Sequence, residues 1–197
     1  MTNLEDTLLA VKGGADAVGF IFYNKSPRAV SVKTVKSIVS ALPPFIETVG
    51  VFVNASADRI NRVADSCNLS AVQLHGNESP AFCKKIRRKV IKAVRVKGKE
   101  SFDGLSSFKV SAILLDAHSE EQQGGTGETF DWRLVGEGKK YGPVILAGGL
   151  DPKNVAHAIQ KVKPYAVDVC SGVERMPGKK DPARLKAFIK AVKDGKP

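Results

Sequence analysis

The fold of this chain is decided by residues 2–22, which read TNLEDTLLAVKGGADAVGFIF. Residues 2–14 predict a helix, because Thr2 and Glu5 form a capping box and the glycines at 13 and 14 end the apolar periodicity. Residues 17–22 form an apolar run that predicts a buried strand. We therefore expect the chain to open on a helix with no strand before it, although every later helix follows a strand.

After this opening, strand and helix patterns alternate along the chain. Seven β-branched or apolar runs predict buried strands at residues 17–22, 48–53, 71–74, 90–94, 112–115, 144–147 and 166–169. Amphipathic stretches of helical period lie at residues 32–42, 57–67, 79–87, 102–108, 131–136, 152–162 and 181–193. Most of these begin with a Ser or Asp cap or with a Pro in the first turn. Strict alternation predicts parallel strands joined by helical crossovers, so the fold class is α/β.

The simplest fold with seven strands and eight helices in this order is a (β/α)8 barrel that lacks strand 1. A doubly wound sheet is the alternative, but no G-x-G-x-x-G fingerprint follows any predicted strand. The 197 residues contain no linker or shift in composition, so we expect a single barrel domain over residues 1–197, truncated at its N-terminus. The two strands beside the gap would each lack a neighbour, which predicts a partly open or aggregation-prone chain.

The composition narrows the classes of function. The formal net charge is +11, and residues 83–89 read CKKIRRK, but no interleaved aromatic residues offer a stacking surface for bases. We expect the positive field to attract a small anionic substrate and not a nucleic acid. No apolar run is long enough to cross a membrane, and no signal-peptide pattern is present. Three cysteines without metal-ligand spacing indicate a cytoplasmic protein with no metal site.

Glycines and polar residues gather directly after the predicted strands, where barrel enzymes carry their active sites. Gly148 and Gly149 follow the strand at 144–147, and Ser171 and Gly172 follow the strand at 166–169. Backbone amides that no side chain covers receive phosphate oxygens readily, and the loops after the last two barrel strands commonly do so. We expect a phosphate site here; the alternative is that these glycines only allow tight turns.

Other candidate residues occupy equivalent positions. Asp116 ends the run AILLD and is a candidate general acid, since apolar neighbours favour its protonated form; the alternative is a cap or loop residue. Arg28 in NKSPR is a candidate for binding a carboxylate through two parallel hydrogen bonds, or else a surface residue. Gln73 and His75 in QLHG are possible site residues, although a lone His is more often a structural donor. Lys92 is expected to fill the barrel interior beside a carboxylate.

The loop over residues 122–132 reads QQGGTGETFDW. Three glycines in four positions predict a mobile lid over the substrate, and the alternative is a connector without such a role. No G-K-[ST] follows the glycines, so the loop is not a Walker phosphate-binding loop.

Several motifs, in order along the whole chain, together resemble one enzyme family. They are GADAVGFIFY, SPR, VGVFVN, AVQLHG, IKAV, LLD, GGTGxTFDW, LAGGLxPxNV and DVxSGVExxPGKKD. The chain is similar in these motifs to the phosphoribosylanthranilate isomerases of L-tryptophan biosynthesis. The resemblance implies a ribulose-phosphate-binding barrel that converts N-(5-phosphoribosyl)anthranilate into 1-(2-carboxyphenylamino)-1-deoxyribulose 5-phosphate. This reaction is an Amadori rearrangement, and the resemblance implies no metal or cofactor.

The same resemblance implies roles for individual residues. Asp116 matches the general acid, which protonates the ribose ring oxygen and opens the sugar to a Schiff base. Arg28 matches the residue that faces the anthranilate end, and Asp168 matches a position near the sugar and the phosphate. The implied partner is the small-molecule substrate and neither a nucleic acid nor a membrane. The protein is expected to be a monomer or a homodimer.

One part of the family pattern is not found. The family's general base is a Cys in a first strand that reads approximately V-K-I-C-G-I, but here Met1 stands directly before Thr2. Cys67 and Cys83 are expected to be buried in helices. Cys170 replaces the first Ser of the usual S-S-G-V-E and is a possible substitute base on the catalytic side. The alternatives to an active isomerase are a catalytically dead barrel that binds sugar phosphates and a fragment completed by another chain.

Overall fold

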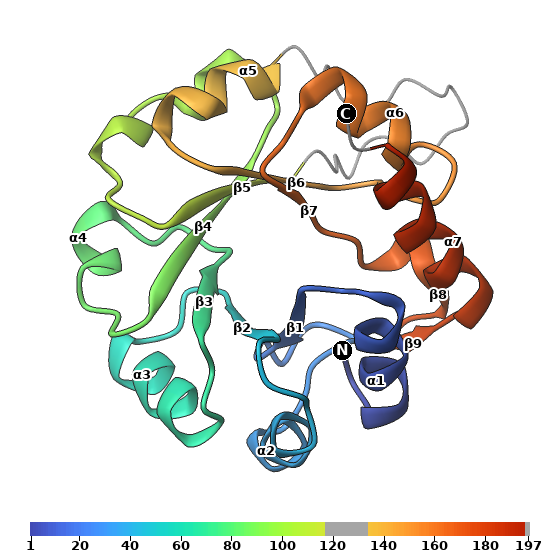
Figure 1. Ribbon diagram of the computed structural model, residues 1–197. Helices are drawn as coiled ribbons and strands as arrows, with labels where there is room; N and C mark the ends of the chain where they lie inside the picture. Colours follow the sequence, from blue (N-terminus) through green and yellow to red (C-terminus); the bar gives the residue numbers. More distant parts are fainter. Residues whose placement is uncertain (117–133, 196–197) are drawn as a thin grey trace.

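The computed structural model describes residues 1–116 and 134–195. Seven parallel strands form one sheet in chain order, as the sequence predicts (Figure 1). They are β1 (Ala17–Ile21), β2 (Glu47–Phe52), β3 (Ala71–Leu74), β4 (Lys89–Arg95), β5 (Ala112–Asp116), β6 (Val144–Ala147) and β7 (Ala166–Val167). A short antiparallel hairpin of β8 (Glu174–Met176) and β9 (Lys179–Lys180) follows β7 and was not predicted.

Helices connect the strands and lie on the outer side of the curled sheet (Figure 1). They are α1 (Leu4–Gly13), α2 (Val32–Ser40), α3 (Ala57–Ser66), α4 (Pro80–Cys83), α5 (Val135–Gly138), α6 (Val155–Val162) and α7 (Pro182–Asp194). The 3-10 segments are η1 (Lys99–Phe102), η2 (Leu105–Ser107), η4 (Lys139–Tyr141) and η5 (Ser171–Val173). The predicted Ser and Asp caps are confirmed at Ser31, Ser56, Ser79 and Asp181, whose side chains accept backbone N–H bonds from the first helical turn.

The sheet curls about an axis, and β1 and β7 are its two edge strands (Figure 1). Within the described residues these strands pair with β2 and β6 and not with each other. The segment before α1 lies between β1 and the β8–β9 hairpin. The backbone nitrogen of Met1 donates to the carbonyl of Gly19, and the Thr2 hydroxyl donates to the carbonyl of Gly178.

The two faces of the sheet bury different side chains. On the outer face, Phe52 and Val90 belong to a large apolar cluster that includes residues of α2, α3 and α4. On the inner face, Ala93, Leu114 and Ala147 form a smaller cluster with no helical member. Because successive side chains on a strand point to opposite faces, these clusters fix which face every other strand residue occupies.

The predicted position of Lys92 in the barrel interior is wrong. Lys92 alternates with Ala93 and therefore shares the outer side of β4 with Val90, so it does not fill the barrel interior. The predicted carboxylate partner is confirmed as Glu78, whose Oε2 lies 2.9 Å from Lys92 Nζ, with both side chains buried. Glu78 also accepts the backbone N–H groups of Asn54 and Gly76, so it joins the loops after β2 and β3.

Predictions at several helix ends are wrong. Asn3, and not Thr2, caps α1, because its side chain accepts the Asp6 N–H. The helix expected over 102–108 is replaced by η1 and η2, since Asp103 is extended and Gly104 is left-handed with φ 74°. Three expected elements are shorter: α4 ends at Cys83, α6 begins at Val155 and β7 ends at Val167.

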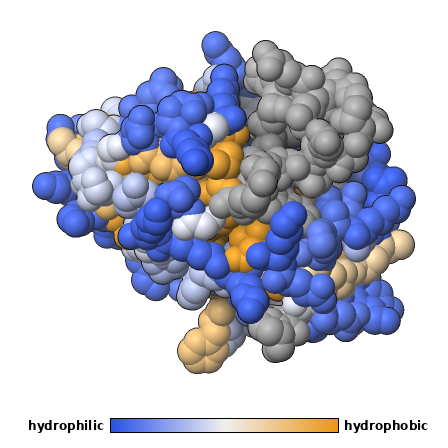
Figure 2. Space-filling model, turned by 90° about the horizontal axis from the view of Figure 1, so that it is seen from above, coloured by the Kyte–Doolittle hydropathy of each residue, from blue (hydrophilic) through white to orange (hydrophobic). Residues whose placement is uncertain are grey.

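The surface is largely hydrophilic on the face that Figure 2 shows, and apolar residues are visible in a recess among hydrophilic ones. Within the described ranges, the helices are all too short or too polar to span a membrane.

Candidate active site

The alternation of side chains brings the central predicted residues together at the C-terminal ends of the strands. Asp116 shares the inner side of β5 with Leu114, and Gln73 and His75 point inward from β3 and its end. His75 Nε2 lies 3.3 Å from Asp116 Oδ2, and Gln73 Nε2 lies 3.0 Å from His75 Nδ1. When the Gln73 amide donates to Nδ1, a neutral imidazole carries its proton on Nε2 and donates it to Asp116.

Asp168 is a second carboxyl on this face. Its backbone N–H donates to the carbonyl of Leu146 at 2.8 Å, so the chain stays beside β6 past the end of β7. Asp168 is exposed at the surface, but protein atoms lie closely around its carboxyl group. The resulting desolvation raises the pKa of Asp168 above the ordinary Asp value. The negative charge of Asp116 adds to the rise, while Lys180 and His75 oppose it. Asp168 therefore holds a proton more readily than an ordinary Asp.

A cavity of about 510 Å³ adjoins these residues at the ends of β2, β3 and β4. His75 and Arg95 line it together with Asn54 and Gly76. Arg95 is a site residue that the sequence reasoning missed. It lies on the inner side of β4, two residues after Ala93, and its register partner on β5 is Asp116. The sequence contains a signal for this position of Arg95, because the same alternation of side chains that places Ala93 inward also places Arg95 inward.

The glycine loops after β6 and β7 pack directly against each other. Gly148 and Gly149 are both left-handed, with φ 84° and 65°. A Cβ on Gly172 would lie 2.0 Å from the carbonyl oxygen of Leu150, so only glycine permits this approach. To the residues that the structure describes, the amides of Gly148 and Gly149 donate no hydrogen bond. Ser171 begins η5 beside this contact.

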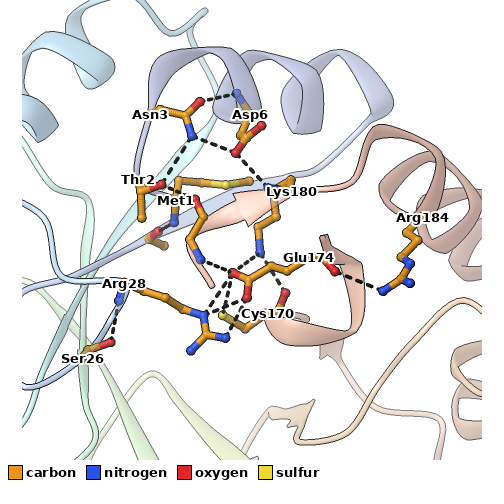
Figure 3. A network of polar contacts seen from close by, with 12 residues as sticks. Met1, Thr2, Asn3, Asp6, Ser26, Arg28, Cys170, Glu174, Lys180 and Arg184 are labelled. Carbon is orange, nitrogen blue, oxygen red and sulfur yellow. Dashed lines mark hydrogen bonds and ion pairs between the residues drawn. The ribbon is translucent and has the colours of Figure 1, made fainter. Parts of the chain in front are cut away.

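Arg28 lies on the same side of the sheet, in the loop after β1, and is held by Glu174 (Figure 3). Its Nε lies 3.0 Å from both Glu174 oxygens, and its Nη2 lies 2.7 Å from Oε2. Lys180 Nζ lies 3.4 Å from Glu174 Oε1 on the other side. Because its side chain is only 24% exposed and is fixed in this way, Arg28 is not the isolated surface residue of the alternative interpretation.

The cysteines divide as predicted. Cys67 and Cys83 are buried at the ends of α3 and α4. Cys170 lies on the catalytic side, with its Sγ 3.9 Å from Glu174 Oε1 (Figure 3). The surrounding protein raises the pKa of the Cys170 thiol, and the charge of Lys180 only partly opposes this. The thiolate that a general base requires is therefore scarce at neutral pH.

The loop over residues 122–132, interpreted as a lid, lies outside the described residues. Across residues 1–116 and 134–195, the His, Cys, Asp and Glu side chains form no group suited to a metal ion.

Comparison with known proteins identifies the family. Residues 1–191 match the family described as N-(5'phosphoribosyl)anthranilate (PRA) isomerase. An N-(5'-phosphoribosyl)anthranilate isomerase from Citrifermentans bemidjiense is 55% identical over 193 residues, which are 98% of this chain and 94% of that protein. The crystal structure of phosphoribosyl anthranilate isomerase from Thermotoga maritima has a TM-score of 0.92 at 48% identity, covering 98% of this chain and 96% of that one. A phosphoribosyl anthranilate isomerase in complex with reduced 1-(o-carboxyphenylamino)-1-deoxyribulose 5-phosphate has a TM-score of 0.87 at 46% identity, covering 98% and 95%. The chain belongs to the N-(5'-phosphoribosyl)anthranilate isomerase family.

Proposed function

We propose that this chain catalyses the Amadori rearrangement of N-(5-phosphoribosyl)anthranilate to 1-(2-carboxyphenylamino)-1-deoxyribulose 5-phosphate in L-tryptophan biosynthesis. The observation that carries the proposal is the pair of His75 and Asp116, 3.3 Å apart at the C-terminal mouth of the barrel. The family of the chain supports the same reaction. The two contacting glycine loops and the held guanidinium of Arg28 supply sites for the two anionic ends of such a substrate.

The substrate's phosphate binds at the loops after β6 and β7. Among the described residues the amides of Gly148 and Gly149 donate to none, so we assign the phosphate oxygens to them, and Ser171 and Gly172 lie across the contact with Leu150. The carboxylate on the aromatic ring binds at Arg28, since a guanidinium matches a carboxylate with two parallel N–H groups.

Between these two ends, Asp116 acts as the general acid. Its carboxyl gives a proton to the ribose ring oxygen as the C1–O bond breaks, and the lone pair of the anthranilate nitrogen forms the C1=N bond of a Schiff base. His75 holds the Asp116 carboxyl in place through its Nε2, and Gln73 fixes the imidazole in turn. Asp168 lies close enough to Asp116 for the charge of that carboxylate to raise the pKa of Asp168, and we assign Asp168 to the sugar part of the site.

A base then removes the proton from C2, and the electron pair becomes the C1=C2 bond of an enolamine that tautomerises to the ketone. The resemblance assigns this step to a Cys before Thr2, and Met1 occupies the position next to Thr2 in this chain. Cys170 is a poor substitute, because its pKa is raised and its Sγ faces Glu174. The alternative of a catalytically dead barrel that binds sugar phosphates is not favoured by the family of the chain.

The proposal extends to the setting of the reaction. We infer a single cytoplasmic barrel domain that acts on a small molecule without metal or cofactor, as a monomer or a homodimer. The phosphoribosylanthranilate isomerase of Thermotoga maritima is described as dimeric.

A growth test distinguishes the two functions. A tryptophan auxotroph that lacks this isomerase is transformed with the chain or with its Asp116→Asn variant. We expect growth without tryptophan for the first and none for the second, since the amide cannot donate the ring-opening proton with the strength of a carboxyl. If neither the chain nor the variant supports growth at equal expression, the result favours a barrel that binds sugar phosphates without catalysis.

A further inference from the structure

The contact between Arg28 and Glu174 joins parts of the chain 146 residues apart. The Glu174 carboxylate takes the Nε side of the guanidinium, with Nε 3.0 Å from both oxygens and Nη2 2.7 Å from Oε2 (Figure 3). The Glu174 side chain is only 5% exposed. Two parallel charge-assisted hydrogen bonds fix both the position and the plane of a guanidinium.

This arrangement leaves one edge of Arg28 without a partner among the described residues. A guanidinium has five N–H groups, and the carboxylate of Glu174 engages the one on Nε and one of the two on Nη2. Among the residues that the structure describes, Nη1 donates to none. The Nη1 group and the remaining Nη2 group form a second parallel pair on the far edge of the plane, with the geometry that a second carboxylate requires.

The neighbours of Glu174 keep this second edge attractive to an anion. Lys180 Nζ lies 3.4 Å from Glu174 Oε1 and 2.9 Å from the carbonyl oxygen of Cys170, and both charged side chains are buried. The Glu174 carboxylate lies between the two cations Arg28 and Lys180, so these three side chains carry a net charge of +1. Glu174 is itself anchored, because Gly178 N–H donates to its Oε1 and Arg184 Nη1 donates to its backbone carbonyl.

We propose that Glu174 is a positioning residue that fixes the plane of Arg28 so that its second edge, formed by Nη1 and Nη2, receives the carboxylate of the substrate's aromatic ring. The inference rests on the proposed function, in which Arg28 binds that carboxylate. Glu174 does not touch the substrate. It holds the Arg28 side chain in one orientation before binding, so the substrate does not have to order it.

The sign of one substitution separates positioning from simple electrostatics. Glu174→Gln removes a negative charge 2.7 Å from the guanidinium, and a purely electrostatic role predicts tighter binding of an anionic ring. A positioning role predicts weaker binding, because the amide has a single acceptor oxygen and its NH₂ group opposes the Arg28 donors. The two explanations thus predict opposite changes.

The experiment measures calorimetric dissociation constants for two probes. One is reduced 1-(o-carboxyphenylamino)-1-deoxyribulose 5-phosphate, and the other is the same compound without the carboxylate. We expect Glu174→Gln to weaken binding of the first about tenfold and of the second less than twofold, since only the carboxylate uses the ordered edge. Glu78→Gln is the matched control, because it removes a buried Glu–Lys pair elsewhere and should leave the ratio of the two constants unchanged.

Each result has one meaning. Tighter or unchanged binding of the carboxylate probe to Glu174→Gln overturns the positioning role. Equal loss for both probes, or the same change in ratio for Glu78→Gln, indicates a general structural effect and also overturns it. If the wild-type chain binds both probes equally, then the Arg28 part of the proposed function fails, and if it binds neither, the proposed function itself fails. Restored discrimination in Glu174→Asp, with a carboxylate on a shorter side chain, supports the proposal further.

Discussion

Replacement of Gly172 by Ala tests whether the contact between the two glycine loops is required for activity. An added Cβ would lie 2.0 Å from the Leu150 carbonyl oxygen, 3.0 Å from its carbon and 3.2 Å from the Cα of Asp151. All three atoms belong to the backbone, so no side chain can rotate away. Ordinary contact begins at 3.4 Å, and the two loops must therefore separate by about 1.4 Å.

The magnitude follows from that displacement. Overpacking of this kind costs about 1–3 kcal/mol of unfolding free energy, which lowers the melting temperature of a chain of this size by about 4–8 °C at the middle of the range. A misplacement of about 1 Å at a site lowers the rate about 100-fold. We therefore expect kcat/KM to fall about 100-fold, with a weaker affinity for phosphate-bearing ligands.

The assay follows the loss of substrate fluorescence with purified wild type and Gly172→Ala, and calorimetry measures unfolding. Gly136→Ala in α5 is the control, since its Cβ would meet nothing within 4 Å. A helical Gly replaced by Ala gains up to about 1 kcal/mol of stability, so this control should be at least as stable as wild type and equally active. Wild-type kcat/KM in a folded Gly172→Ala protein would show that the close contact of the two loops is not required for activity.

Two further predictions concern other parts of the structure. Asp116→Asn should lower kcat by about 10²–10⁴-fold while the reduced product analogue still binds, and wild-type turnover by this variant would remove Asp116 from the role of general acid. Glu78→Gln should lower the unfolding free energy by about 3 kcal/mol at pH 7, because it leaves the buried Lys92 ammonium without its carboxylate. Burial opposes ionisation of Glu78, but the hydrogen bonds from Lys92 and from backbone amides outweigh it and hold its pKa below the ordinary value. The stabilisation is thus present above the unfolded pKa of about 4.3 and is lost as pH falls through the lower folded value, so urea unfolding of wild type and variant should converge in acid. A difference that is constant with pH would contradict this origin.

The seven strands of the sheet could be located from the sequence because each apolar run is short and bounded by turn residues, although β7 is shorter than predicted and the β8–β9 hairpin was not predicted. The run AILLD, for example, has no polar residue before Asp116, and the structure forms β5 over the same residues. The alternation of side chains along a strand then decides which residues face inward. The inward position of Arg95 could have been predicted in this way. The helix predicted over 102–108 failed because Gly104 adopts a left-handed conformation that periodicity does not reveal.

The site was predicted in part. The residues after strands were correctly expected at one end of the barrel, since parallel strands bring their C-terminal ends to the same side. The pairing of Arg28 with Glu174 could not be predicted, because the two residues are 146 positions apart and the short β8–β9 hairpin that begins at Glu174 has no strong strand pattern. The contact of Gly172 with Leu150 is a backbone approach, and sequence shows only that a glycine is present.

The most direct test of the account is turnover by the purified 197-residue chain itself. The substrate N-(5-phosphoribosyl)anthranilate loses its fluorescence on rearrangement, and the rate is measured against protein concentration with Asp116→Asn as the blank. We predict a rate above background that rises in proportion to the wild-type protein and is about 10²–10⁴-fold lower in the variant. A rate equal to the blank, in a folded protein that still binds the reduced product analogue, would contradict it and leave a barrel that binds sugar phosphates without catalysis.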